Sequence, residues 1–208
     1  RAKRFLNESC GGCAMNLPNK LSLLRIIMVP VMAAVYLIPV WYAPIISVAL
    51  FALAAFTDFL DGHIARKYDM VTDLGKLLDP IADKMLICFA LFLVVEKNIL
   101  PIGVGSFCGA IIICRELLIS VVRQIAAGKG VIIQANKYGK FKTIFQDISL
   151  PVLMLLAIPM EGALKTVMSW TGYVLFGAAV LLTIISCVVY LVQNKGVFVD
   201  SAKTTEKK

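Results

Sequence analysis

The sequence lacks a long polar stretch, a heptad repeat, a low-complexity tract and any repeat of fixed period. Because no polar linker divides the chain, we predict a single domain that is neither a coiled coil nor a repeat array. Histidine is nearly absent, and we interpret the only one, His63, as a bystander rather than a metal ligand. Six cysteines in 208 residues do not indicate the disulfide framework of a small secreted protein. Four of them lie inside apolar runs, where we expect buried thiols: Cys88, Cys108, Cys114 and Cys187.

Apolar residues dominate what the sequence does contain. They make up 60% of the chain, with a mean hydropathy of +0.86, whereas soluble domains are usually about 45–50% apolar. Runs close to the ~18–20 residues that cross a bilayer recur along most of the length. We therefore predict an all-α, polytopic membrane protein with six transmembrane helices, near 21–39, 43–61, 78–96, 100–126, 141–159 and 167–192.

The basic residues predict the orientation of these helices. The connections at 62–77 and 128–142 contain three and four Lys or Arg residues, whereas the connection at 39–43 contains none. By the positive-inside rule, the basic connections and both termini are cytoplasmic in the cell membrane. The net charge of +8 is not gathered on one amphipathic face, so anionic lipid and topology explain it better than nucleic acid does. Aromatic residues suited to anchor the opposite face are Trp41, Tyr42, Trp170 and Tyr173.

The ends of the sequence are set apart from the membrane domain, which we place at 15–195. Met15 reads as a natural start, so residues 1–14 are interpreted as an appended or N-terminal segment. This segment contains a Cys10-Gly-Gly-Cys13 pair, which is weak evidence for a metal or redox site without a second pair. No cleavable signal is expected, and residues 196–208 are predicted to form a basic cytoplasmic tail.

Four aspartates lie where charges are least expected, at the end of the second predicted span and the start of the third. Asp58 and Asp61 are three residues apart, and Asp79 and Asp83 are four apart, so each pair projects from one face of its helix. A carboxylate at membrane depth costs at least ~2.5–3.5 kcal/mol, so four within 26 residues need a positive partner. Hard divalent cations prefer such oxygens, and two ions would hold four carboxylates together. We expect Mg²⁺ or Mn²⁺, as two ions, on these four side chains.

Small residues and one arginine accompany the aspartates. At Gly62 and Gly75, a missing Cβ would let a phosphate-bearing ligand approach closely, and Ala65 is small for the same reason. Arg66, one turn beyond Asp61, is suited to a bidentate contact with phosphate. A purely structural alternative is that carboxylates and Arg lock two helices together.

The run resembles the signature of the CDP-alcohol phosphotransferases, Asp-x2-Asp-Gly-x2-Ala-Arg-x8-Gly-x3-Asp-x3-Asp, with every fixed position filled. The resemblance implies a six-helix membrane enzyme with a divalent-metal site, a CDP-linked donor and release of CMP. By position, it implies that Asp58, Asp61, Asp79 and Asp83 are metal ligands and that Asp83 is also the general base. It implies that Gly62, Ala65, Arg66 and Gly75 contact the CDP moiety.

Three further sequence patches narrow the choice of acceptor alcohol. They begin at Asn16, Arg115 and Gly139, and they resemble the family members that use CDP-diacylglycerol and glycerol 3-phosphate. Arg115 and Arg123 lie eight residues apart, close to one helical face, and with Lys142 they are suited to cradle the acceptor phosphate. The alternative is that Arg115 pairs with Glu116 or an aspartate and that Arg123 reaches to the membrane surface. Asp147, also inside an apolar run, is expected to pair with a lysine or to line the acceptor cavity.

Other functions stay open at this point. Synthesis of phosphatidylserine, phosphatidylinositol phosphate or cardiolipin would share the aspartates and differ in the acceptor pocket. Membrane prenyltransferases also use Asp-rich motifs, but on helices far apart in sequence. A cation transporter would need paired sites in inverted repeats, whereas the acidic cluster occupies one half of this chain only. The resemblance also suggests a homodimer, for which small residues such as Gly172 and Gly177 could supply packing.

Overall fold

The computed structural model describes residues 17–67, 73–101, 103–128 and 137–193, and within them the side chains of 59–67, 73–77, 79 and several helix-terminal residues lie outside the description. The described part is all-helical, as predicted. Its helices are α2 (Leu17–Leu37), α3 (Ala43–Lys67), α4 (Asp73–Glu96), α5 (Val104–Gly128), α6 (Lys137–Leu155) and α7 (Gly162–Gln193).

The helices extend beyond the apolar runs that predicted them. α3 continues past the expected end at residue 61 to Lys67, and α4 begins at Asp73 rather than at 78. The apolar pattern marks where a helix is lipid-facing or buried, but a polar turn can continue the same helix. The fixed positions of the signature therefore all lie within α3 and α4.

Three helical segments are long and apolar enough to cross a membrane: Asn19–Leu37, Val104–Gln124 and Gly162–Gln193. A shorter apolar segment covers Ala43–Asp58 in α3. α4 and α6 are not among these segments, and Asp or Lys residues occupy the first half of each. The exposed surface includes many large apolar side chains, for example Ile27, Phe107 and Val174, as expected of a protein surrounded by lipid. Six spans remain the prediction, and a membrane-embedded bundle is what these features indicate.

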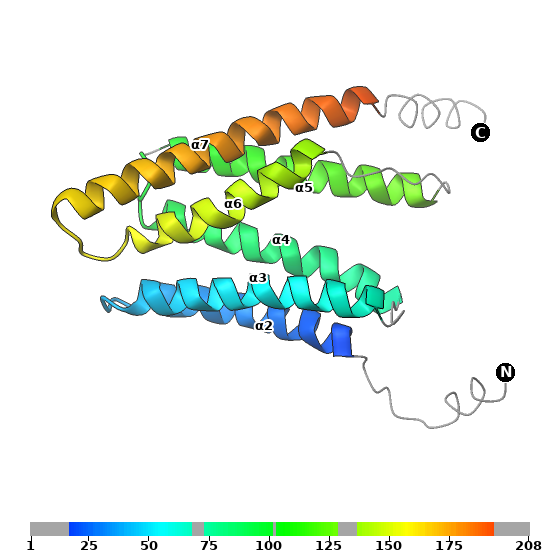
Figure 1. Cartoon of the computed structure of the whole chain (residues 1–208), viewed down its shortest axis with the longest axis horizontal. Coiled ribbons are helices and arrows are strands. Elements are labelled where there is room, and N and C mark those ends of the chain that lie inside the picture. The colour runs from blue at the N-terminus through cyan, green and yellow to red at the C-terminus, as the bar shows by residue number, and fades with distance from the viewer. Residues whose placement is uncertain (1–16, 68–72, 102, 129–136, 194–208) are drawn as a thin grey trace.

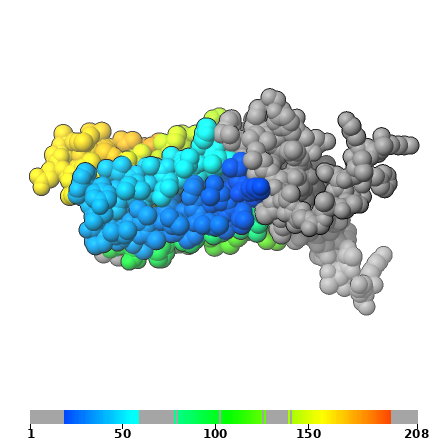
Figure 2. All heavy atoms as spheres, turned by 90° about the horizontal axis from the view of Figure 1, so that it is seen from below, coloured from blue at the N-terminus to red at the C-terminus, as the bar shows by residue number. Residues whose placement is uncertain are grey.

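The six described helices run side by side along the long axis of the molecule (Figure 1). α2, α4 and α6 begin at one end of the bundle, where α3, α5 and α7 finish, and we call this the polar end (Figure 1). α2 packs on α3 and α4, and α6 packs on α7. Figure 2 shows α2 and α3 together forming one long face of the molecule. This arrangement brings the charged halves of α3, α4 and α6 to the same end.

The apolar core joins the helices away from the polar end. Fully buried side chains come from α2, α3, α4 and α6, including Met32, Phe51, Leu93 and Leu153. Tyr36 adds a hydrogen bond from α2, because its hydroxyl donates to the carbonyl oxygen of Met154 at 2.9 Å. That carbonyl lies in the last turn of α6 and also accepts from the Ala157 amide at 3.3 Å.

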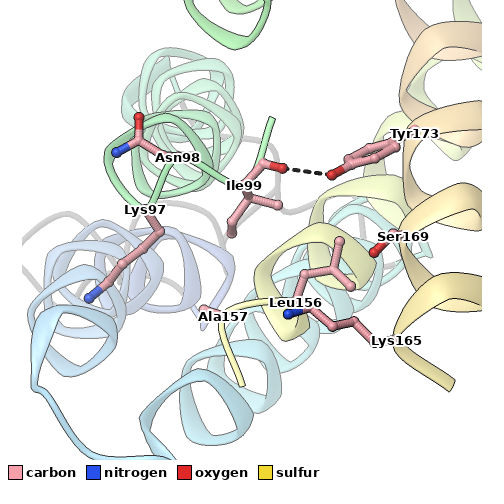
Figure 3. Close-up of a pocket in the computed structure, with 8 residues that line it drawn as sticks. All are labelled: Lys97, Asn98, Ile99, Leu156, Ala157, Lys165, Ser169 and Tyr173. Atoms are coloured by element: carbon pink, nitrogen blue, oxygen red, sulfur yellow. Dashed lines mark hydrogen bonds between the residues drawn. The ribbon is translucent and has the colours of Figure 1, made fainter. Parts of the chain in front are cut away.

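The opposite end of the bundle holds the α4–α5 turn and the start of α7. Asn98 adopts a positive φ of 50° after α4, and the amides of Asn98 and Ile99 donate back to Val95 and Val94, which is the Schellman arrangement that ends a helix. The Tyr173 hydroxyl of α7 donates to the Ile99 carbonyl oxygen at 2.9 Å (Figure 3). A cavity of about 350 Å³ lies beside this bond.

Small residues of α7 pack against another helix of the same chain. Gly172 is buried against α6, and a Cβ there would lie 2.8 Å from a methyl carbon of Leu153. Ala179 is also fully buried, whereas Gly177 is exposed with nothing within 4 Å of an added Cβ. The four thiols are less buried than expected: Cys88, Cys108 and Cys187 are partly buried, and Cys114 is exposed on the outer side of α5. In a membrane this side faces lipid, which suits an apolar thiol equally well.

Candidate active site

The aspartate signature lies where α3 finishes and α4 begins. Asp58 is in the second half of α3 and Asp83 is in the first half of α4, and their charges are close enough to interact. Asp61 and Asp79 belong to the same two helices, but their side chains lie outside the described residues. The same holds for four expected CDP contacts, of which α3 contains Gly62, Ala65 and Arg66 and α4 contains Gly75. The charges of Asp58 and Asp83 thus interact across the two helices, whereas a shared site of all four aspartates stays a prediction.

A buried arginine holds Asp58. The Arg25 Nη1 atom of α2 lies 2.5 Å from Asp58 Oδ1, and the exposed fractions of the two side chains are 0% and 45%. A buried guanidinium is stable only when it is paired, so this contact fixes α2 against α3 and sets the position of the carboxylate. The half-exposed Asp58 keeps a face open to ligands. An arginine inside an apolar run is the sequence signal for such a pair, but its partner is set by packing.

Two cations of the predicted acceptor pocket meet on one carboxylate. Glu116 of α5 accepts hydrogen bonds from Arg115 Nη1 at 3.1 Å and from the Lys142 ammonium of α6. Arg115 Nη2 donates to Ser186 Oγ of α7 at 2.5 Å. Lys142 is only 1% exposed. Three helices thus converge on a buried group whose formal charge is +1.

Arg115 and Lys142, which we call the cation pair, retain a hydrogen-bond donor that is not used. The Nε atom of Arg115 is buried and has no hydrogen-bond partner among the described residues. Arg115 and Lys142 together carry two charges against the single charge of Glu116. A bound phosphate would therefore find both a net positive charge and an unused N–H group.

Arg123 is placed differently from the other two predicted acceptor residues. Its side chain is exposed, and its guanidinium carbon lies 5.9 Å from the centre of the Tyr190 ring on α7. This is cation–π geometry, and it directs the side chain to α7 rather than to the cation pair. The structure therefore brings Arg115 and Lys142 together and leaves Arg123 apart from them.

Asp147 links the cation pair to the aspartates. It is half-buried on α6, and its charge interacts with those of Asp83, Lys142 and Asp58. Asp83 in turn is exposed and interacts with Asp58, Glu116 and Arg25. One electrostatic cluster thus spans α2 to α6, with carboxylates on one side and the cation pair on the other. Exposed Asp83 gives a ligand access to it.

The donor set suits a hard divalent cation. Asp58 and Asp83 supply carboxylate oxygens from two helices, and like charges that interact are stabilised by a cation between them. Within the described part of the chain, no three carboxylate, thiol or imidazole side chains form a metal-binding group, and the side chains of Asp61 and Asp79 belong to the remainder. The residues present fit Mg²⁺ or Mn²⁺ and offer none of the soft ligands that favour other metals.

Comparison with known proteins identifies the family. A sequence profile of the CDP-alcohol phosphatidyltransferases matches residues 15–195. The chain belongs to this family. Three relatives each bear the name CDP-diacylglycerol–glycerol-3-phosphate 3-phosphatidyltransferase. The Bacillus subtilis protein is 37% identical over 158 residues, which is 70% of this chain and 80% of that protein. The Rickettsia bellii protein is 36% identical over 171 residues (82% and 91%), and the Salmonella choleraesuis protein is 33% identical over 192 residues (89% and 98%).

The candidate site of this CDP-alcohol phosphatidyltransferase includes residues to which the sequence alone assigned no role. Arg25 was given no role from the sequence, and Glu116 was considered only as an alternative partner of Arg115. The available signal was that a charged side chain inside an apolar run needs a partner of opposite charge. The identity of that partner cannot be read from spacing, because the Glu116–Lys142 contact joins residues 26 apart. The cavity in Figure 3 belongs to the opposite end, and none of the described residues that line it was predicted for the site.

Proposed function

We propose that the chain transfers the phosphatidyl group of CDP-diacylglycerol to sn-glycerol 3-phosphate, which yields phosphatidylglycerophosphate and CMP. The observation that carries the proposal is the buried cation pair on Glu116, which lies in one electrostatic cluster with Asp58 and Asp83. An anionic acceptor needs such a group, whereas a neutral alcohol does not. The names of the three relatives support the same acceptor.

The donor is placed by the signature residues of α3 and α4. Asp58, Asp61, Asp79 and Asp83 would hold two divalent ions, Mg²⁺ or Mn²⁺, and these would supply positive charge against the CDP pyrophosphate. Gly62, Ala65 and Gly75 would let the nucleotide approach the helix backbones, and Arg66 would pair with a phosphate. Arg25 supports this arrangement because its ion pair fixes the position of the Asp58 carboxylate.

The transfer itself needs a base and a leaving group. The C1 hydroxyl oxygen of the acceptor attacks the phosphorus that carries diacylglycerol, and the bond from this phosphorus to the CMP oxygen breaks. Asp83 would take the hydroxyl proton, since its carboxylate is exposed and its charge interacts with those of Asp58 and Glu116. CMP then leaves with the electron pair of the broken bond.

The acceptor phosphate is assigned to Arg115 and Lys142, with Arg123 in an outer role. Arg115 has a buried, unused Nε–H group among its described contacts, and Lys142 is held in place by Glu116. Arg123, exposed over Tyr190, would attract the anion towards the site rather than enclose it. Glu116 would act as the positioning residue that keeps two like charges side by side.

The site is proposed to open to the cytoplasm. The basic predicted connections lie at 62–77 and 128–142, and α3, α4, α5 and α6 have their adjoining termini at the polar end (Figure 1). Both termini would then be cytoplasmic, where a soluble acceptor and CMP are available. We also propose a homodimer, which the exposed outer face of α7 around Gly177 leaves room for.

The test is release of CMP by the purified protein in detergent. With CDP-diacylglycerol and Mg²⁺ or Mn²⁺, glycerol 3-phosphate should support turnover, whereas serine, inositol phosphate and phosphatidylglycerol should not. Chelation of the metal should abolish turnover, and its return should restore it. Turnover with another acceptor only would overturn the acceptor assignment while leaving the donor chemistry in place.

A further inference from the structure

Gln146 of α6 is a buried polar residue to which none of the roles above applies. Its side chain is 0% exposed, and neither the nitrogen nor the oxygen of its amide has a hydrogen-bond partner among the described residues. The neighbouring Ser149 hydroxyl engages only the backbone carbonyl of Gln146, at 3.1 Å. A buried amide without partners lowers stability, so its presence points to a partner supplied by a ligand.

The position of Gln146 on α6 indicates which ligand. Successive residues of an α-helix are turned by about 100°, so Gln146 lies roughly 40° round the helix from Lys142 and one turn further along. Asp147 lies about 100° beyond Gln146 in the same direction. Lys142 faces Glu116 of α5, and the charge of Asp147 interacts with Asp83 and Asp58. Gln146 therefore lies between the cation pair and the aspartates.

The acceptor must bridge the same gap. Its phosphate is assigned to the cation pair and its C1 hydroxyl to Asp83, which leaves the C2 hydroxyl between them. A hydroxyl both donates and accepts, and a primary amide offers one acceptor and two donors. The amide of Gln146 thus matches the C2 hydroxyl, the one group of glycerol 3-phosphate that has no assigned partner.

We propose that Gln146 determines acceptor specificity by hydrogen bonding to the C2 hydroxyl of glycerol 3-phosphate. Its Oε1 atom accepts a hydrogen bond from the C2 hydroxyl, and Nε2 donates a hydrogen bond to a neighbouring oxygen of the same molecule. This inference rests on the proposed function, because it takes glycerol 3-phosphate as the acceptor.

The experiment compares glycerol 3-phosphate with propane-1,3-diol monophosphate, which keeps the reactive hydroxyl and the phosphate but lacks the C2 hydroxyl. The wild-type enzyme should have at least a ~10-fold higher kcat/KM for glycerol 3-phosphate, as the loss of one buried hydrogen bond predicts. Gln146→Met keeps the length of the side chain and removes both polar groups, so this preference should fall to about one. The KM for CDP-diacylglycerol should not change.

Ser149→Ala is the matched control on the same buried face, one turn further along α6. It should retain the full preference for glycerol 3-phosphate. A folded Gln146→Met enzyme that keeps the wild-type preference would overturn the inference, and so would a wild-type enzyme that uses both acceptors equally well. The second result needs no variant, so misfolding of Gln146→Met leaves the idea testable. If the wild type releases no CMP with either acceptor but does with another, the proposed function itself fails.

Discussion

At the scale of single residues, Asp58 and Asp83 have different surroundings although they belong to one signature. Asp58 is paired with buried Arg25, whereas Asp83 is exposed. We expect Asp83→Asn to reduce kcat by about 10²-fold or more, as loss of a general base does, while binding of CDP-diacylglycerol changes little. Asp58→Asn should instead weaken metal-dependent donor binding. Equilibrium binding of the donor at several Mg²⁺ concentrations, beside turnover, separates the two. Equal loss of binding in both variants would make Asp83 chiefly a metal ligand.

The two arginines of α5 give a second comparison at this scale. Arg115 belongs to the buried cation pair, and Arg123 is exposed over Tyr190. Truncation of a buried charge contact costs about 2–5 kcal/mol, so Arg115→Ala should raise the KM for glycerol 3-phosphate by roughly 30-fold or more. Arg123→Ala should change it by no more than a few-fold, and that change should shrink as salt is added. A large, salt-independent effect of Arg123→Ala would place this residue in the pocket after all.

At the scale of helices, α6 and α7 approach closely because Gly172 has no side chain. An added Cβ would lie 2.8 Å from Leu153 Cδ2, and Leu153 is fully buried and has little room to move. Gly172→Val should therefore destabilise the protein by about 1–3 kcal/mol. Gly109→Val on α5 is the matched control, since its Cβ would meet nothing within 4 Å. Thermal unfolding in detergent, followed by size-exclusion chromatography, should show a lower midpoint for the first variant only. Equal midpoints would contradict the close packing.

Sequence periodicity predicted these helices well but not the contacts between them. All six predicted spans correspond to helices, whereas the carboxylate faces expected from the aspartate spacing stay a prediction, because the side chains of Asp61 and Asp79 lie outside the described residues. The contacts of Arg25 with Asp58 and of Lys142 with Glu116 join different helices, and such pairs depend on tertiary packing rather than on local spacing. Helix boundaries were also missed, because polar turns extend α3 and α4 beyond their apolar runs. Gln146 shows the same limit, since its lack of partners is visible only once the helices are packed.

At the scale of the whole molecule, the charges are unequally divided between the two ends. The polar end contains the aspartates and the cation pair, whereas the described part of the opposite end has few charged residues, among them Lys97 and Lys165 beside the cavity of Figure 3. Exposed Trp41 and Trp170 belong to the connections and helix starts of that opposite end. Aromatic side chains favour the membrane–water boundary, so they indicate where the bilayer stops. The polar end then lies at the other boundary, within reach of soluble substrates.

This polarity predicts the orientation of the chain in a cell. With the six native cysteines replaced, single cysteines can be placed at Lys20, near the start of α2, or at Lys165, near the start of α7. Both positions are exposed. A membrane-impermeant maleimide should label Lys165→Cys in intact cells, and it should label Lys20→Cys only after permeabilisation, because the positive-inside rule places the basic end in the cytoplasm. The reverse pattern would put the aspartates outside the cell, where the CDP-linked donor and glycerol 3-phosphate are not supplied. Retained CMP release by both variants would show that the labelled chains are folded.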